Sequence, residues 1–226
     1  MLILLVNTKK LKNDNKRLKS MRFRSIYFAS ILRIEMITVL FLIAPGFEPL
    51  EAIAPIDYLK RAGATVVLAA VGTEKLGVKS ALGLKIKCDV HFEDVSNNVY
   101  DAVVCPGGMP GAKNLATNEE VVRFIKKHFE NNKIVGAICA SPGLVLAEAC
   151  GIMKGKNGCG YPGFDNKIAQ YEGNLITSQD VVVDGNVITS RGPATAVQFA
   201  LALVKALYGE DKEIEIGKGT LYYKDQ

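Results

Sequence analysis

From residue 37 to residue 208 the sequence alternates short apolar runs with longer amphipathic segments. Residues 37–43 are apolar apart from Thr38, as expected of a parallel strand that is buried on both faces. Residues 49–61 follow with apolar side chains at helical spacing, and Gly63 stands where such a helix would end. The same order recurs along the chain. Further strands are predicted at 65–71, 82–88, 102–105 and 134–138, helices at 119–130, 141–149 and 194–208, and a hairpin at 181–189 around Asp184 and Gly185.

Strands and helices that alternate with short connections form a doubly wound, mostly parallel sheet with helices on both faces. The sequence therefore predicts an α/β fold of this kind for a single domain, residues 36–226. Ligands of such sheets bind beyond the carboxyl ends of the strands, so functional residues are sought there. No run of roughly eighteen or more uncharged apolar residues occurs, and no membrane-spanning segment is expected.

The basic charge of the chain is concentrated at its start. Residues 1–35 contain nine Lys or Arg and two acidic residues, whereas the other 191 residues carry a net charge of −2. A nearly neutral folded body gives no reason to expect specific nucleic-acid recognition. We interpret residues 1–35 as a basic extension that is disordered or not part of the mature protein. It is either an organellar presequence or the result of a translation start upstream of Met36, and the second is favoured because a strand follows Met36 at once.

The cysteines indicate the redox environment. They are odd in number and include no C-x-x-C pair, so neither a disulfide framework nor a zinc site is expected. No metal and no cofactor are expected. Free cysteines favour a reducing compartment, and we expect a cytoplasmic protein, or an organellar one if residues 1–35 are a genuine presequence. The five are Cys88, Cys105, Cys139, Cys150 and Cys159.

Cys139 stands between the predicted strand at 134–138 and the predicted helix at 141–149. Small residues surround this junction, as in the strand–nucleophile–helix elbow of hydrolases, although their G-x-S-x-G spacing is absent. The free N–H groups and positive end of the following helix would stabilise a thiolate, so we expect a thiol pKa below the ordinary value of about 8.5. The alternative is a buried cysteine that acts as a small apolar side chain.

Two other strand ends carry candidate partners for this cysteine. Gly107 and Gly108 follow the strand at 102–105, and their backbone N–H groups, with that of Ala140, would form an oxyanion hole; a plain tight turn is the alternative. Glu51 follows the first strand, in the first turn of a helix. A carboxyl group there would be protonated near neutrality and hydrogen-bond a thiolate, unless it is simply solvated at the helix N-terminus.

Four blocks of sequence, at residues 46–63, 100–108, 135–144 and 189–195, together resemble the ThiJ/PfpI family. The similarity extends over residues 36–226 and is closest to the branch of the Parkinsonism-associated protein deglycase (DJ-one) and its bacterial relatives. It implies a flavodoxin-like fold, similar to class I glutamine amidotransferases, and a homodimer. It also implies that Cys139 is the nucleophilic, oxidation-sensitive cysteine, that Glu51 is hydrogen-bonded to it, and that Gly107, Gly108 and Ala140 are the backbone donors near the thiolate.

The resemblance has one departure near the site. Where many members have a histidine before a proline, this chain has Tyr161 and Pro162, which we expect to form a wall of the site. Arg191 matches a structural arginine of the family. The two histidines, His91 and His128, match no family position, and each is expected to be a surface or hydrogen-bonded histidine.

The activity that the resemblance implies is that of a cysteine-dependent glyoxalase or deglycase. Such an enzyme acts on methylglyoxal or on its early adducts on proteins or nucleotides and releases lactate. A non-enzymatic redox sensor or chaperone that uses the same oxidisable cysteine is the alternative, and an intracellular cysteine peptidase is disfavoured by the missing histidine. Cys159 is either a resolving cysteine that forms a disulfide with Cys139 or an unpaired loop thiol.

Overall fold

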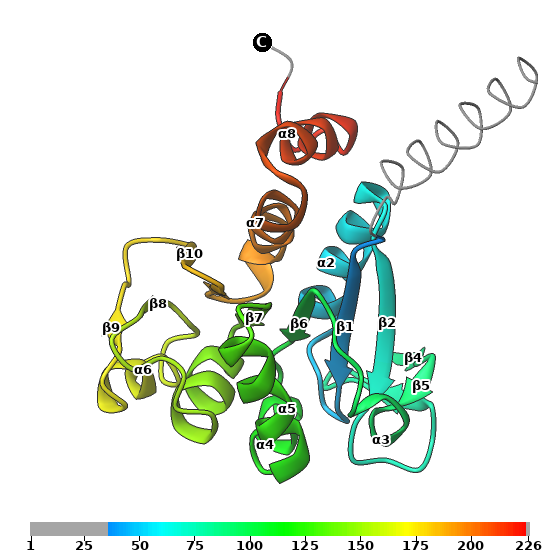
Figure 1. Cartoon of the computed structure of the whole chain (residues 1–226), viewed down its shortest axis with the longest axis vertical. Helices are drawn as coiled ribbons and strands as arrows, with labels where there is room; N and C mark the ends of the chain where they lie inside the picture. Colours follow the sequence, from blue (N-terminus) through cyan, green and yellow to red (C-terminus); the bar gives the residue numbers. More distant parts are fainter. Residues whose placement is uncertain (1–35, 225–226) are drawn as a thin grey trace, which may run out of the picture. The chain divides into compact units, whose positions relative to one another are not determined.

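The structure is a computed structural model that describes residues 36–224. The basic extension predicted at residues 1–35 lies outside the described residues. Figure 1 shows a central sheet with helices packed along it. Within residues 36–224, every helix is too short or too polar to span a bilayer.

Seven strands form one sheet, in the order β10-β11-β7-β6-β1-β2-β5. Neighbouring strands run parallel except at one edge, where β10 and β11 form the predicted hairpin. This topology confirms the predicted doubly wound, mostly parallel sheet. It also places the carboxyl ends of β1, β6 and β7 side by side. The strands are β1 (Thr38–Ile43), β2 (Thr65–Ala70), β5 (Val90–His91), β6 (Ala102–Cys105), β7 (Ile134–Ile138), β10 (Val181–Asp184) and β11 (Val187–Ser190).

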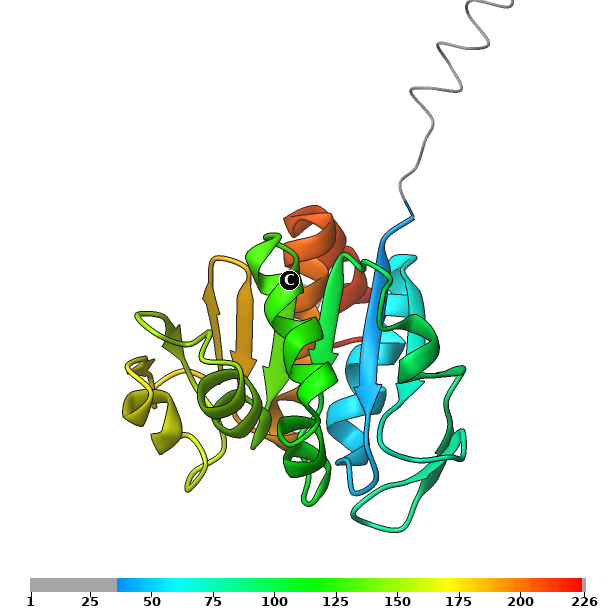
Figure 2. The same ribbon diagram turned by 60° about the horizontal axis from the view of Figure 1, so that its bottom comes forward.

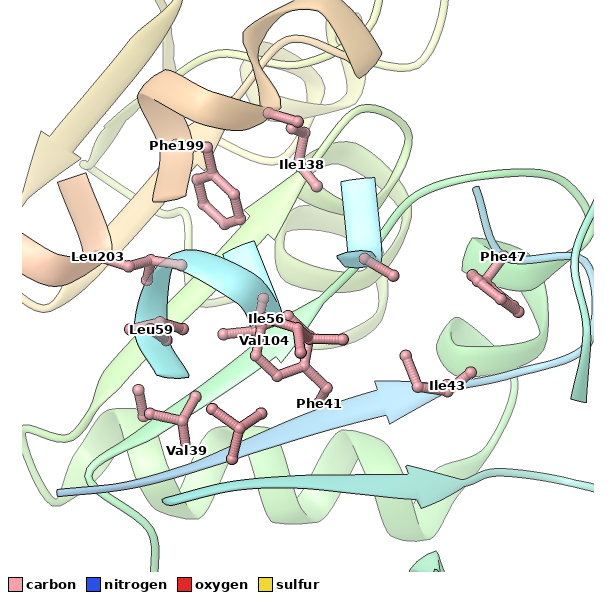
Figure 3. Close-up of a cluster of buried hydrophobic side chains, with 14 of the residues drawn as sticks. Val39, Phe41, Ile43, Phe47, Ile56, Leu59, Val104, Ile138, Phe199 and Leu203 are labelled. Atoms are coloured by element: carbon pink, nitrogen blue, oxygen red, sulfur yellow. The ribbon is translucent and has the colours of Figure 1, made fainter. Parts of the chain in front are cut away.

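Helices cover both faces of the sheet (Figure 2). Alternate residues of a strand point to opposite faces, so each face has its own apolar cluster. Val39, Phe41 and Ile43 of β1 pack in a cluster to which α2, α7 and α8 contribute side chains, and Figure 3 shows the part formed with Ile56 and Leu59 of α2 and Phe199 and Leu203 of α7. Leu40 and Leu42 pack in a second cluster, against α5 and shorter helices. The helices are α2 (Pro49–Ala62), α3 (Phe92–Val95), α4 (Gly111–Ala116), α5 (Glu119–Glu130), α6 (Asn166–Gln170), α7 (Ala196–Tyr208), α8 (Glu210–Gly219), the π-helix η1 (Pro142–Ala149) and the 3₁₀ turn η2 (Pro193–Thr195).

Two predicted elements differ in detail from the structure. The strand expected at 82–88 is shorter, β4 (Lys85–Lys87), and forms a hairpin with β3 (Gly77–Lys79). The helix expected at 141–149 is the π-helix η1, in which the Cys150 N–H donates to the carbonyl of Val145, five residues earlier. Short strands such as β3, β8 (Asn157–Gly158) and β9 (Asn174–Leu175) carry too few residues to show a period in the sequence.

Helix α8 was not expected from the sequence. The helix before it ends at Gly209, as predicted, and this glycine has a φ of 90°, which separates α7 from α8. Ile216 is the one large apolar residue that α8 buries, beside Glu213 and Gly217. The apolar periodicity that predicts a helix is therefore too weak in this segment.

His128, in α5, is buried and its ring makes two hydrogen bonds. Its Nε2 lies 3.1 Å from the backbone nitrogen of Tyr100, and its Nδ1 lies 2.9 Å from the carbonyl oxygen of Phe124. Because a backbone N–H can only donate, Nε2 accepts and the ring is neutral, with the proton on Nδ1. This is the hydrogen-bonded histidine expected from the sequence, and its role is in the core.

We expect His128→Gln to make the protein's stability less sensitive to acid. Burial lowers the pKa of His128. The stabilisation by the neutral ring is thus complete above the unfolded value of about 6.5 and is lost as the pH falls below it. Glutamine keeps an acceptor for Tyr100 but does not titrate. Urea unfolding between about pH 7.5 and pH 5 tests this. As the pH is lowered, the free energy of unfolding should fall more steeply in the wild type than in the variant, with a difference in slope of up to about 1.4 kcal/mol per pH unit. Parallel curves would contradict this account.

Candidate active site

Cys139 occupies a strained turn between β7 and η1. Its φ is 67°, in the left-handed region that residues with a side chain rarely adopt. Its N–H donates to the Ser190 carbonyl (2.9 Å) and its carbonyl accepts from the Tyr161 N–H (2.8 Å). The Ser141 hydroxyl donates to the Pro106 carbonyl (2.6 Å), which ties this turn to the loop after β6. The turn has the conformation expected of a nucleophile elbow.

Glu51 is fully buried in the first turn of α2 and faces the cysteine. Its Oε2 accepts a hydrogen bond from the Gly107 N–H (2.9 Å). Its Oε1 is buried and makes no hydrogen bond to the residues that the structure describes. The carboxyl and Cys139 lie on either side of Gly107, because a Cβ on Gly107 would come within 2.6 Å of both Glu51 Oε2 and the Cys139 Cβ. The Cys139 thiol is therefore the neighbouring group that can exchange a proton with Glu51.

The protonation states of Glu51 and Cys139 depend on each other. Burial raises the pKa of Glu51 to about 7. Burial, followed by the neighbouring Glu51 carboxylate, raises the pKa of Cys139 to about 12. The two groups ionise as a coupled pair, and the first proton is lost near neutrality. The expectation of a low thiol pKa is thus wrong: when Glu51 is ionised, the remaining proton stays on Cys139, and a thiolate forms only when that proton is transferred to Glu51.

Two backbone N–H groups act on the Cys139 sulfur. The backbone N–H groups of Gly108 and Ala140 lower the pKa of the Cys139 thiol, which opposes the effects of burial and of Glu51. Gly107 was expected to act with them, but its N–H donates to Glu51 instead. Gly107 therefore orients the carboxyl, and the candidate donors to an oxyanion are Gly108 and Ala140.

Gly107 has no room for a side chain. A Cβ built there would lie 2.5 Å from Glu51 Oε2 and 2.6 Å from the Cys139 Cβ, closer than side-chain carbons approach. At Gly108, where φ is +87°, a side chain would collide with the backbone of Glu48. These two glycines let the loop after β6 lie directly between Glu51 and Cys139.

We expect Gly107→Ala to uncouple Glu51 from Cys139 without unfolding the protein. The added methyl group must displace the carboxyl or the elbow, at a cost of about 1–3 kcal/mol. The dicarbonyl activity expected from the sequence should then fall on the order of a hundredfold, because small displacements of catalytic groups have effects of this size. Gly219→Ala is the matched control, because a Cβ at Gly219 meets no atom within 4 Å. Wild-type activity in Gly107→Ala would show that the close packing is unimportant.

A hollow of about 280 Å³ opens beside the elbow. Tyr161 and Pro162 line it together with Arg191. The Tyr161 side chain is 45% exposed, and its ring lies against Gly192. The guanidinium of Arg191 lies 3.8 Å from an oxygen of Asp180, and both side chains are partly exposed. The hydrogen bond from the Tyr161 N–H to the Cys139 carbonyl (2.8 Å) places this hollow next to the elbow, but neither Cys139 nor Glu51 is among the residues that line it.

The structure places Cys159 and the two histidines in separate surroundings. The Cys159 sulfur is buried, 3.4 Å from the Thr189 carbonyl oxygen and 3.7 Å from that of Asp180. A disulfide between Cys159 and Cys139 stays a hypothesis, and the contacts favour an unpaired buried thiol. His91 ends β5, which is separated from β7 by three strands in the sheet order, and His128 bonds to Tyr100. Neither histidine therefore forms a catalytic pair with Cys139.

Sequence reasoning did not find two residues that support the site. Ser141 ties the elbow to the loop after β6, and Glu48 caps α2 with an oxygen that accepts from the Glu51 N–H (2.7 Å). An acceptor side chain directly before a proline that begins a helix is a recognised capping pattern, and it was available at Glu48 and Pro49. No comparable signal marks Ser141.

Comparison with known proteins gives the family. Residues 37–206 match the model of the DJ-1/PfpI family. The chain belongs to the DJ-1/PfpI family. This confirms the resemblance drawn from four sequence blocks. DJ-1/PfpI proteins of known structure share the fold: oxidised DJ-1 of Toxoplasma gondii superposes with a TM-score of 0.77 at 35% identity, over 83% of this chain and all of that one.

Curated DJ-1/PfpI relatives include proteins named for their activity. Protein DJ-1 homolog B of Arabidopsis thaliana is 45% identical over 79% of this chain and 40% of its own length, so the chain spans less than half of that plant relative. A glutathione-independent glyoxalase of Caenorhabditis elegans is 37% identical over 73% of this chain and 85% of its own length. A deglycase of Pyrococcus horikoshii is 34% identical, over 75% of this chain and 98% of its own length.

Proposed function

We propose that the chain is a cysteine-dependent glyoxalase or deglycase that acts on methylglyoxal or on its early adducts and releases lactate. The observation that carries the proposal is the fully buried Glu51 carboxyl, held by the Gly107 N–H (2.9 Å) beside the strained turn of Cys139. The names of two relatives, a glyoxalase and a deglycase, support the same chemistry.

The proposed reaction begins when Glu51 takes the thiol proton and the Cys139 thiolate adds to the aldehyde carbon of methylglyoxal. The N–H groups of Gly108 and Ala140 hydrogen-bond to the oxyanion that forms, and Glu51 passes its proton to this oxygen, which gives a thiohemiacetal and restores the carboxylate. Glu51, as a carboxylate, removes the proton from that carbon and returns it to the neighbouring one through an enediol, which leaves a lactoyl thioester. Water hydrolyses the thioester to lactate and regenerates the thiol. A carboxyl with a pKa of about 7 can both accept and donate a proton at neutrality.

The test of this proposal is lactate formation from methylglyoxal by the purified protein, without added glutathione. An adduct of methylglyoxal with an amino acid, supplied in place of the free dicarbonyl, distinguishes deglycase from glyoxalase activity. Release of lactate and of the free amine from the adduct supports the deglycase form. Absence of lactate from both substrates would refute the proposal.

A redox sensor or chaperone is the second candidate, because the same pair suits an oxidised cysteine. A protonated Glu51 would donate a hydrogen bond to a sulfinate at Cys139, and the buried setting would restrict further oxidation. Such a protein would gain oxygen on Cys139 in dilute peroxide but would turn over no dicarbonyl. Mass spectrometry of the Cys139 peptide, run beside the lactate assay, separates the two candidates.

We also propose that the protein forms a homodimer, as its family resemblance implies. Four exposed apolar side chains lie on α2 and on the β3–β4 turn. The Ala81 N–H donates to the Phe47 carbonyl (2.9 Å) and holds that turn beside the start of α2, so the two groups of side chains lie near each other. Sedimentation of the wild type and of a Leu82→Glu variant tests the proposal, and a monomeric wild type would refute it. The four side chains are Leu50 (50% exposed), Ile53 (44%), Leu82 (75%) and Leu84 (60%).

A further inference from the structure

Two residues of the hollow, Arg191 and Tyr161, stand next to the nucleophile along the backbone. The carbonyl of Ser190, which directly precedes Arg191, accepts from the Cys139 N–H (2.9 Å). The Tyr161 N–H donates to the Cys139 carbonyl (2.8 Å). The hollow of about 280 Å³ that Arg191 and Tyr161 line therefore begins one backbone hydrogen bond from Cys139. It is placed to receive the part of a substrate that extends past a carbonyl reacting at the sulfur.

The guanidinium of Arg191 has hydrogen-bonding capacity that the protein does not use. It carries five N–H donors, and among residues 36–224 its one ion pair is with Asp180, at 3.8 Å, which is too long for a hydrogen bond. Both side chains are partly exposed, and ion pairs of this kind contribute little to stability. A ligand anion can therefore replace Asp180 as the partner of Arg191.

The loop that carries Arg191 is fixed by hydroxyl groups. The Ser190 hydroxyl donates to the Asp180 carbonyl (2.9 Å) and lies 2.6 Å from the Thr195 hydroxyl. The Thr195 hydroxyl in turn accepts from the Gly192 N–H (3.1 Å). The backbone around Arg191 is thus in place before a ligand arrives, which lowers the entropic cost of binding.

The rest of the hollow is largely apolar. The Tyr161 ring, Pro162, Pro193 and Ala194 line it, and the ring lies against Gly192, where a Cβ would be 3.2 Å from Tyr161 Cδ2. Pockets that enclose a whole drug-sized ligand measure about 300–1,000 Å³. At about 280 Å³, this hollow suits one part of a substrate, with a small apolar body and one anionic group.

We propose that the hollow binds the amine part of a glycated substrate, and that this part is an amino acid with a free carboxylate. The planar fork of the Arg191 guanidinium matches a carboxylate through two parallel hydrogen bonds. The Tyr161 ring and the two prolines would cover a small apolar side chain. A nucleotide also carries an anion, but its base, sugar and phosphate together need a larger pocket.

The experiment measures binding directly and does not depend on turnover. N-acetylleucine is the probe, and N-acetylleucinamide, which has nearly the same shape but no charge, is its matched comparison. Each is titrated into the isotopically labelled full chain. The amide NMR signals of Gly192 and Ala194, which line the hollow, report the dissociation constant.

Three variants complete the design. Arg191→Gln removes the positive charge, whereas Asp180→Asn keeps it and removes the competing carboxylate. Arg123→Gln is the matched control, because Arg123 forms a similarly exposed pair with Glu119 (3.7 Å) on another helix, α5. Thermal unfolding of each variant verifies that it is folded.

The wild type should bind the acid roughly fivefold to tenfold more tightly than the amide, the effect of one charge-assisted pair in a partly solvated site. The two probes should bind equally weakly to Arg191→Gln. The preference for the acid should increase about twofold or more in Asp180→Asn, which frees the guanidinium, and should be unchanged in Arg123→Gln.

Equal binding of the two probes to the wild type would overturn the proposal, as would a preference for the acid that survives in Arg191→Gln. Shifts elsewhere in the spectrum without shifts at Gly192 and Ala194 would also overturn it, because the probe would then bind outside the hollow. The same holds if a nucleoside monophosphate binds there more tightly than N-acetylleucine. If Arg191→Gln does not fold, Asp180→Asn decides, and an unchanged preference in that variant counts against the proposal.

The link to turnover rests on the proposed function, but the binding measurement does not. If the protein is a deglycase, kcat/KM should be higher for the methylglyoxal adduct of leucine than for that of leucinamide, and this ratio should fall toward one in Arg191→Gln. Acid-selective binding in a protein that forms no lactate would leave the carboxylate site intact and refute the enzyme assignment. Lactate formation by a protein that binds both probes equally would do the reverse.

Discussion

A Cys139→Ala variant should form no measurable lactate from methylglyoxal and should still fold as the wild type does. The substitution removes the only atom of this turn that can form the thiohemiacetal, so the loss should be on the order of a thousandfold or more. The fold should tolerate it because alanine also has a Cβ, so the strain of the left-handed φ at residue 139 does not change. The thermal midpoint should fall by no more than a few degrees, the effect of roughly 1 kcal/mol in a domain of this size.

Cys88→Ala is the matched control for this loss. Cys88 is also a buried thiol, but it packs in the apolar cluster of α2 and α7 and bonds by its backbone to Leu76. Its replacement should reduce stability to a similar degree without affecting lactate formation. Activity near the wild-type level in Cys139→Ala would remove Cys139 from the reaction. An equal loss in Cys88→Ala would indicate general damage to the protein and not loss of a nucleophile.

The sheet was predictable because its central strands are apolar throughout and are separated by segments with a clear helical period. Residues 102–105 and 134–138 were predicted with the bounds that the structure shows. Helix α8 was not predicted because it lacks such an apolar pattern. Its packing depends on one isoleucine and on a glutamate, Glu213, that bonds to Tyr223. The sequence also gave no sign that the helix after Cys139 is a π-helix, because apolar residues throughout this segment leave its hydrogen-bonding pattern undetermined.

The main residues of the site were predictable for a topological reason. Cys139, Gly108 and Glu51 each follow a strand, and parallel strands that lie side by side bring their carboxyl ends together. The partners of individual backbone hydrogen bonds were not predictable. Whether the Gly107 N–H points to the sulfur or to Glu51 depends on how the loops after β1 and β6 interlock. The sequence suggested a low thiol pKa from the helix terminus alone, because it does not show the burial of the thiol or the neighbouring charge of Glu51, both of which raise that pKa.

Glu51→Gln should reduce lactate formation by about a hundredfold to ten-thousandfold, the range found when a general acid–base group is removed. Glutamine has nearly the same shape and can still accept from the Gly107 N–H, so the turn around it should be retained. It cannot take a proton from one carbon and return it to the next. The pH dependence of the rate is the most specific test of this role. Wild-type activity should rise through about pH 7, where burial places the ionisation of Glu51, and the variant should show no such rise.

Tyr161→Phe is the comparison that separates a proton shuttle from a wall of the site. The Tyr161 side chain is 45% exposed and lines the hollow with its ring, and its contact with the elbow is made by its backbone N–H, which phenylalanine retains. Loss of the hydroxyl should therefore change the rate by less than about threefold, the effect of a partly solvated hydrogen bond. Steady-state rates of both variants, measured on the same substrate at several pH values, test the assignment. A loss of rate in Tyr161→Phe as large as that in Glu51→Gln would mean that the phenol moves a proton in the reaction. If the rate of Glu51→Gln still rises through about pH 7, that ionisation belongs to another group.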